Sequence, residues 1–326
     1  MASSTSQAQR ATVFIAASES DSNLYYATKF IAPDPFIYLE IKGERILVMS
    51  DLEMDRAKSQ SSVDRVVSYS EVEGRAKTQG IAEPGTVEVV HILLREAGIT
   101  QITVPANFPF GHAVKFQSLG YQLHPKRDPF YEQRVVKTAE EVRYIEAAQR
   151  ATEQAVAAAH NLLRQASINN DQLWHGGVPL TSERVKKLIN VALMECDCVA
   201  QHTIVAGGEQ ACDPHNEGSG PLPAHRSIIF DVFPRSASNR YFADMSRTVV
   251  RGTPSPELKR LYQTVLDAQE EAITKIKDGA DGKRIHQGIC ARFEKAGYQT
   301  GLVNGRMQGY FHGTGHGVGL DIHEAP

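Results

Sequence analysis

Cysteine is scarce in this chain of 326 residues, which contains Cys196, Cys198, Cys212 and Cys290 and no others. Four cysteines are too few to form a disulfide scaffold in a chain of this length. Their spacing also provides no pair of Cys-x-x-Cys units, the pattern that is typical of a zinc knuckle. We therefore expect reduced thiols, the usual state of cysteine in the cytosol.

Long apolar runs are lacking as well. The first residues, MASSTSQAQRA, contain no apolar stretch of signal-peptide length, and no later stretch is long and apolar enough to cross a bilayer. These absences predict a cytoplasmic protein without a membrane partner. Residues 1–11 are predicted to form a disordered tail.

An excess of either charge is also missing, because 35 Lys and Arg nearly balance 38 Asp and Glu and the formal net charge is -3. Surfaces that bind nucleic acids or anionic membranes usually carry an excess of basic residues. We therefore expect no nucleic-acid partner and favour a small, roughly neutral substrate. The chain is too long for one ordinary hydrophobic core, so we expect two domains.

Residues 12–123 alternate short strand and helix patterns. The strand patterns are ATVFIAA, FIYLEI, RILVMS and QITVP, and a helix pattern extends from Val87 to Glu96. The Lys42-Gly43 pair between the second and third strand patterns predicts a hairpin turn. This order predicts a small α/β domain. Residues 124–134, HPKRDPFYEQR, are rich in proline and charge and are predicted to form a linker.

Residues 135–326 show the order helix, helix, strands twice. The first copy begins at Thr138, which has capping-box spacing to Glu141, and ends at Arg251. The second copy begins near Pro256, a residue that suits the first turn of a helix. We predict an internal duplication in which the second copy is shorter by roughly 45 residues and lacks most of its strands. The predicted fold class is α+β.

Two strand patterns of the first copy each carry an aspartate among apolar residues: Asp231 in SIIFDVF and Asp244 in YFADMSRT. A carboxylate in a buried strand costs free energy unless it is paired, hydrogen-bonded or bound to a metal. For one such aspartate, an ion pair with Arg247 is a sufficient explanation. The turn-prone segment PRSASN between the strands favours a hairpin in which the two carboxylates face each other, and a bound metal then explains both.

The final segment, FHGTGHGVGLDIHEAP, contains His312, His316 and His323. His312 and His316 have the spacing of a helical zinc pair, but the neighbouring glycines disfavour a helix. In an extended strand these two side chains share one face, and His323 lies on the other unless the chain bends. A fourth candidate, His215, belongs to the turn-rich segment CDPHNEGSG. A single histidine of this kind is best explained as a hydrogen-bonded imidazole, whereas three in one short segment favour a functional site.

The candidate ligands indicate the chemistry. Carboxylates with one imidazole suit manganese, iron, cobalt or zinc, and no thiolate is placed to compete. Two metal ions that share carboxylates hold a bridging hydroxide at neutral pH, because metal binding lowers the pKa of water to about 7. These residues therefore predict metal-dependent hydrolysis.

The segments FDVF, FADMSRT and HGTGHGVGLDIHE resemble the metallopeptidase family of Xaa-Pro dipeptidases and aminopeptidase P, which shares the pita-bread fold with methionine aminopeptidase and creatinase. This resemblance implies a creatinase-like N-terminal domain over residues 12–123 and a duplicated pita-bread catalytic domain over residues 135–326. It also implies two divalent metal ions, with manganese preferred and cobalt, zinc or iron as alternatives.

The resemblance further implies a role for each candidate residue. Asp231 binds one metal, Asp244 bridges both, and His316 binds the other. His215 and His312 hydrogen-bond the scissile carbonyl or the tetrahedral intermediate, which requires donors directed at developing oxyanion charge. His323 contacts the substrate on the far side of the scissile bond.

Two features depart from the family pattern. Phe233 stands where the family usually has glycine, which narrows the pocket or alters a turn. The family also completes its site with two glutamates on later strands, and neither can be assigned here because Glu324 follows His323 too closely. We therefore expect the chain to end inside the catalytic domain, before that domain's last strands.

The predicted function is hydrolysis of the bond between an N-terminal residue and proline in small peptides, by a dipeptidase or an aminopeptidase. The resemblance also suggests a homodimer. Two alternatives stay open: a pita-bread binding module without catalysis, and a creatinase-like amidinohydrolase. Binding modules of this fold typically lose the metal ligands, whereas this chain keeps the three that its length allows.

Overall fold

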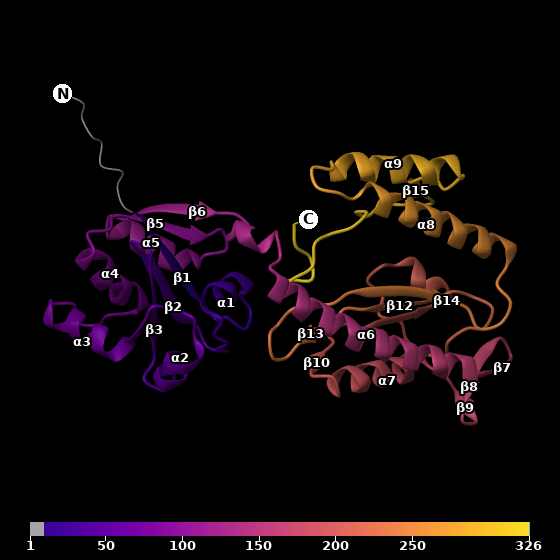
Figure 1. Cartoon of the computed structure of the whole chain (residues 1–326), viewed down its shortest axis with the longest axis horizontal. Helices are drawn as coiled ribbons and strands as arrows, with labels where there is room; N and C mark the ends of the chain where they lie inside the picture. The colour runs from indigo at the N-terminus through magenta and orange to yellow at the C-terminus, as the bar shows by residue number, and fades with distance from the viewer. Residues whose placement is uncertain (1–9, 326) are drawn as a thin grey trace. The chain divides into compact units, whose positions relative to one another are not determined.

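The computed structural model describes residues 10–325. The chain forms two compact units, residues 1–134 and residues 135–326 (Figure 1). Most of the predicted disordered tail lies outside the described residues, but Arg10 and Ala11 belong to the first strand. Ala11 is only 1% exposed, and its packing in the core explains why the strand begins earlier than predicted.

The first unit is built on a six-stranded mixed sheet with the order β4-β3-β2-β1-β5-β6. Its strands are β1 (Arg10–Ala16), β2 (Phe36–Ile41), β3 (Glu44–Met49), β4 (Arg65–Ser68), β5 (Gln101–Pro105) and β6 (Gln122–Lys126). Val13 and Ile15 pack in one hydrophobic cluster and Phe14 in another, because successive strand residues point to opposite faces. The sheet is therefore buried on both faces, which agrees with the predicted small α/β domain.

The helices of this unit include the one predicted from the sequence. They are α1 (Ser22–Thr28), α2 (Met54–Gln60), α3 (Tyr69–Thr78), α4 (Thr86–Glu96) and α5 (Phe110–Ser118). The Lys42-Gly43 turn joins β2 to β3 as predicted, and both residues have positive φ angles, 54° and 84°.

The segment predicted as a linker, residues 124–134, folds with the first unit instead. Its first residues belong to β6, and its end forms a 3-10 turn, η1 (Glu132–Arg134). Arg134 is buried and donates from Nη1 to Asn23 Oδ1 at 2.7 Å. Asn23 Nδ2 in turn donates to Asp128 Oδ1 at 2.8 Å. Charged residues of this segment thus form hydrogen bonds to α1. Composition does not reveal these contacts, so the same charges were interpreted as those of a linker.

The second unit begins with α6 (Ala139–Gln165), whose predicted capping box is confirmed. Thr138 Oγ1 accepts from the Glu141 N–H at 3.2 Å, and Glu141 Oε2 accepts from the Thr138 N–H at 2.7 Å. The other helical elements are α7 (Ser182–Met194), η2 (Gly208–Cys212), α8 (Pro256–Lys275) and α9 (Gly282–Lys295). The short strands are β7 (Ser167–Asn169), β8 (Gln172–His175), β9 (Val178–Pro179), β10 (Cys198–Val199), β13 (Arg235–Ser236), β15 (Gly301–Val303) and β16 (Arg306–Gln308).

A three-stranded antiparallel sheet of β11 (Ile204–Gly207), β12 (Ile228–Val232) and β14 (Met245–Val249) contacts α6 (Figure 1). Ile228, Phe230 and Val232 of β12 are 0% exposed and belong to the same core cluster as the alanine-rich face of α6. Asp231 alternates with these residues and is only partly buried. The period of the strand therefore directs Asp231 to the face opposite the helix.

After α9, the described chain forms the β15–β16 hairpin and then an irregular segment up to residue 325. The order helix, helix, strands thus recurs, with shorter strands in the second copy. The continuation of the catalytic domain beyond residue 326 stays a prediction. Within residues 10–325, no helix combines the length and the apolar character that a membrane crossing requires.

Candidate metal centre

Asp231 lies on β12, and Asp244 directly precedes β14, the strand with which β12 pairs. β12 pairs antiparallel with β14, and Asp231 stands opposite Ser246, whose hydroxyl donates to Asp231 Oδ1 at 2.5 Å. Asp244 precedes Ser246 by two residues, and the charge of Asp231 acts on its carboxyl group, so the two aspartates lie near each other. Ser246 is a contact that sequence reasoning missed, although its spacing from Asp244 could have indicated it.

The electrostatic environment of Asp244 is unfavourable for its charged form. Burial raises the pKa of Asp244, and the negative charge of Asp231 raises it further; His316 and His323 act in the opposite direction without cancelling the rise. The alternative explanation from the sequence was an ion pair with Arg247. Arg247 Nη1 donates to the Ser246 carbonyl instead, at 2.8 Å, and no ion pair joins it to either aspartate in the described part of the chain.

His316 and His323 join the two aspartates. His316 Nε2 lies 3.4 Å from Asp244 Oδ2, and the His316 and His323 rings are 4.5 Å apart at an angle of 83°. The segment does not continue as an extended strand. It bends back on itself, and Gly317 pairs with Glu324 in an isolated antiparallel bridge. This bend, which the sequence left open, brings His323 to the side of His316.

His312 and His215 stand apart from this group. Both are exposed; His312 Nδ1 lies 2.7 Å from the Gly313 carbonyl oxygen, and the His215 N–H donates to Asp213 Oδ1 at 3.1 Å. Among residues 10–325, no hydrogen bond or ion pair joins either histidine to Asp231 or Asp244. The structure therefore brings together four of the six predicted site residues.

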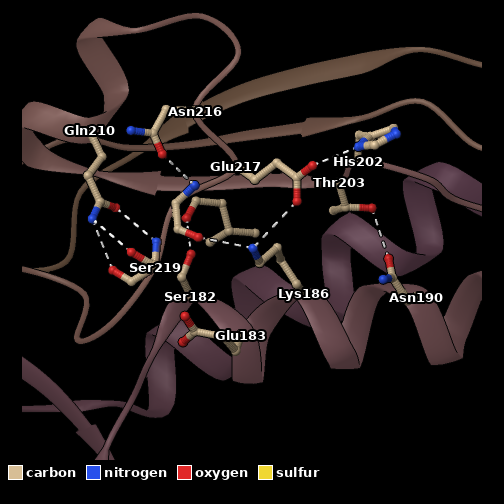
Figure 2. Close-up of polar contacts among 12 residues, drawn as sticks. Ser182, Glu183, Lys186, Asn190, His202, Thr203, Gln210, Asn216, Glu217 and Ser219 are labelled. Carbon is tan, nitrogen blue, oxygen red and sulfur yellow. Dashed lines mark hydrogen bonds and ion pairs between the residues drawn. The ribbon is translucent and has the colours of Figure 1, made fainter.

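The loop that carries His215 is nevertheless held by polar contacts (Figure 2). Lys186 of α7 donates to the Gly218 carbonyl at 3.0 Å, and the Gln210 side chain bonds both the N–H (3.1 Å) and the carbonyl (3.0 Å) of Ser219. Gly218 has a φ of +76°, and a Cβ there would lie 2.0 Å from the Val205 carbonyl oxygen. Only glycine fits this close approach, so the backbone is constrained at Gly218, three residues after the exposed His215.

The donor types in this group suit a divalent ion. Asp231, Asp244 and His316 offer two carboxylates and one imidazole, a set that manganese, iron, cobalt and zinc all accept. Within residues 10–325, however, no three His, Cys, Asp or Glu side chains are arranged to enclose one ion. The donor types of these residues therefore suit a divalent ion, although within residues 10–325 they do not by themselves enclose one.

Comparison with known proteins assigns the chain to a family. The model of metallopeptidase family M24 matches residues 143–326. The Xaa-Pro dipeptidase of Pyrococcus furiosus is 28% identical over 194 residues, which are 59% of this chain and 50% of that protein. The Xaa-Pro dipeptidase of Pyrococcus horikoshii is 25% identical over 309 residues, or 93% of this chain and 76% of that protein. The match to the first of these relatives thus spans half of its length.

Solved structures show the same fold. The prolidase from Pyrococcus furiosus superposes with a TM-score of 0.75 at 22% identity, covering 97% of this chain and 82% of that one. The X-Pro aminopeptidase from Thermotoga maritima gives a TM-score of 0.75 at 21% identity, with 98% and 82% covered. The mixed α/β fold is therefore similar to that of prolidases. Because the family model covers more than half of the sequence, the chain belongs to metallopeptidase family M24.

Proposed function

We propose that this protein is a metal-dependent peptidase that hydrolyses the bond between an N-terminal residue and proline, as an Xaa-Pro dipeptidase or an aminopeptidase P. The observation that carries this proposal is the convergence of Asp231, Asp244 and His316 in a chain of family M24. The two Pyrococcus relatives bear the name Xaa-Pro dipeptidase, which supports the choice of substrate class.

In this proposal the site holds two divalent ions, preferably manganese, with cobalt, zinc or iron as alternatives. Asp231 would hold one ion, His316 would hold the other, and Asp244 would be shared by both. Bound divalent ions lower the pKa of water to about 7 and thereby supply a nucleophile at neutral pH. The protein's own contribution is a negative site that holds the cations and a fixed backbone that carries the histidines.

The remaining histidines act on the substrate. His215 and His312 donate hydrogen bonds to the carbonyl oxygen as negative charge develops on it, and His323 contacts the peptide beyond the scissile bond. The exposure of His215 and His312 supports this role, because their imidazoles are accessible to a substrate. The homodimer and the cytoplasmic location stay predictions.

The experiment compares substrates on the full chain in the presence of Mn²⁺, Co²⁺ or Zn²⁺. We expect release of the N-terminal residue from Ala-Pro or from Ala-Pro-Ala, and no cleavage of Ala-Ala. Treatment with a chelator should abolish the reaction, and adding Mn²⁺ back should restore it. Equal cleavage of Ala-Ala would contradict the proline specificity. Binding of Ala-Pro without hydrolysis under all three metals would favour the binding module, and hydrolysis of creatine would favour the amidinohydrolase.

A further inference from the structure

A buried ion pair joins two ends of the second unit. Lys137 Nζ donates to Glu324 Oε2 at 2.7 Å, across 187 positions in the sequence. The side chains are only 14% and 8% exposed. An ion pair that is largely shielded from water is weakened less by solvent and salt than an exposed one. This pair therefore constrains the segments that carry it more than a surface ion pair would.

The Glu324 end of the pair closes the loop that carries two candidate site residues. Its second carboxylate oxygen, Oε1, accepts from the Asp321 N–H at 3.1 Å. Its backbone forms both hydrogen bonds of the bridge to Gly317, at 2.9 and 3.0 Å. His316 directly precedes Gly317 and His323 directly precedes Glu324, so this bridge places the two imidazoles side by side.

The Lys137 end belongs to the part of the unit that positions the aspartates. Lys137 directly precedes Thr138, the N-cap of α6, and α6 packs against β12 and β14. These are the strands that place Asp231 and Asp244. The ion pair therefore connects the histidine loop to the helix on which the aspartate strands rest.

The Glu324 carboxylate lies against Gly319, where a side chain would clash with it. A Cβ at Gly319 would lie 2.6 Å from Glu324 Oε2, closer than non-bonded atoms approach. The carbonyl of Gly319 also accepts from the Phe242 N–H at 2.8 Å, two residues before Asp244. The loop is thus tied to the aspartate side of the site at a second point, and the position of Glu324 is part of the same arrangement.

We propose that Lys137 and Glu324 are a positioning pair that holds His316 and His323 in register with Asp244, and that metal affinity depends on it. The link to metal affinity rests on the proposed function, whereas the link to loop geometry does not. Groups that orient metal ligands typically change metal affinity by about 10- to 100-fold when they are lost. The same size of effect is expected here.

The test uses the full metal-free chain and its Lys137→Met and Glu324→Gln variants. Glu324→Gln keeps an oxygen for the Asp321 N–H and replaces the oxygen that accepts from Lys137 by an uncharged NH2 group. In each variant we expect the Gly317 and Glu324 amides to exchange with deuterium about tenfold faster, with α6 and β12 unchanged. The Mn²⁺ dissociation constant, measured by calorimetry, should rise at least about tenfold.

Glu271→Gln and Lys275→Met serve as controls, because that pair lies on α8 with its side chains 33% and 45% exposed.

A charge-reversed variant, Lys137→Glu with Glu324→Lys, tests whether the effects of the single variants come from loss of the ion pair rather than from general unfolding. It restores an ion pair, and we expect slower exchange at Gly317 and Glu324 than in either single variant. The positioning pair would be overturned if amide exchange and Mn²⁺ affinity stayed at the wild-type level in both single variants. It would also be overturned if Gly317 and Glu324 exchanged as fast in the reversed variant as in the single variants. Amide exchange tests the positioning pair even if the wild-type chain binds no Mn²⁺ or cleaves no Xaa-Pro peptide. Failure of the proposed function can therefore be distinguished from failure of the positioning pair.

Discussion

Asp244 is the residue on which the other members of the candidate metal centre converge. Asp231 is near enough to raise its pKa, His316 lies 3.4 Å away, and His323 packs against His316. Burial and a neighbouring negative charge both disfavour the Asp244 carboxylate. A bound cation would offset both effects, and this gives the site a physical reason to take up metal.

Replacement of Asp244 should therefore remove metal more completely than replacement of any histidine in the site. We expect Asp244→Ala to lose both ions and all turnover, because in the proposed site both ions would share this carboxylate and would repel each other without it. Metal content after dialysis and Ala-Pro hydrolysis should fall together, while the exposed control Asp278→Ala keeps both. Full metal occupancy with a near-normal rate in Asp244→Ala would refute the ligand assignment.

His312 should behave differently, because its proposed contact is with charge that appears only in the transition state. We expect His312→Ala to keep its metal and to lose turnover by about a hundred- to a thousand-fold. Metal analysis and steady-state kinetics on the same sample separate these effects. Loss of metal from this variant would make His312 a ligand and reverse its role with His316.

At the scale of elements, the loop between Gly317 and Glu324 depends on residues without side chains. A Cβ at Gly317 would lie 2.6 Å from the Ala325 carbonyl oxygen, which is backbone and cannot move aside easily. A Cβ at Gly315 would meet no atom within 4 Å. Of these two glycines, only Gly317 is required by a close backbone contact.

This difference predicts opposite results for two similar substitutions. Gly317→Ala should destabilise the loop by about 2 kcal/mol, because overpacking of a close contact forces the backbone to shift. Gly315→Ala should leave the loop close to wild type. Amide exchange at Glu324 reports the change directly, and equal exchange rates in the two variants would show that the close contact does not constrain the loop.

The start of α4 offers a prediction about pH. Glu88 Oε2 accepts from the Gly85 N–H at 3.0 Å, and Lys115 Nζ lies 2.9 Å from Oε1. Burial alone raises the pKa of Glu88, but Lys115 and the backbone N–H groups outweigh it, and the pKa ends below its usual value. The folded chain then binds fewer protons than the unfolded chain. This contribution to stability is present above the unfolded pKa of about 4.3 and is lost as pH falls through the folded pKa.

We therefore expect Glu88→Gln to reduce the protection of α4 amides by about 0.5 to 1 kcal/mol at pH 7, because Gln keeps an oxygen for the Gly85 N–H but loses the charge that interacts with Lys115 and the helix N-terminus. The difference from wild type should shrink as pH falls below the unfolded pKa of about 4.3 and through the lowered folded pKa, because protonation removes the charge that Gln lacks. The exposed Glu83→Gln is the control. A difference that stays constant between pH 7 and pH 3 would show that the charge of Glu88 does not contribute.

Local signals explain which elements could be predicted. The capping box at Thr138 and the turn at Lys42-Gly43 each depend on residues that are close in sequence, and both are confirmed. α1 and α2 have seven residues each, about two turns, which leaves little periodicity to detect. The contact between Lys137 and Glu324 spans 187 positions, and no local pattern specifies it. Asp231 and Asp244 were found because carboxylates among apolar residues are costly, whereas the bend that places His323 depends on contacts across the whole unit.

At the scale of the whole molecule, each unit has hydrophobic clusters of its own. The buried clusters of the first unit contain residues up to Phe130, and those of the second begin at Ala148. A core of this kind lets each unit contribute its own stability. The single tryptophan of the sequence, Trp174, belongs to β8 of the second unit and so reports on that unit.

Core substitutions in the two units should therefore be separable. Leu94 and Leu193 are both 0% exposed, on α4 and α7. We expect Leu94→Ala to cost about 3 kcal/mol and to shift the urea transition seen by far-UV circular dichroism, while the Trp174 fluorescence transition stays in place. Leu193→Ala should shift the fluorescence transition. Equal fluorescence shifts in both variants would show that the units unfold together.

The ion pair between Lys137 and Glu324 also bears on where the second unit can be cut for study. The family match begins at residue 143, after Lys137 and after the N-cap Thr138. A fragment excised at that boundary would retain Asp231, Asp244, His316 and Glu324 but would lose Lys137 and the contact between Lys137 and Glu324. Weak metal binding by such a fragment would then report the missing lysine and helix cap rather than the quality of the ligands, so a faithful excision has to begin upstream of Lys137.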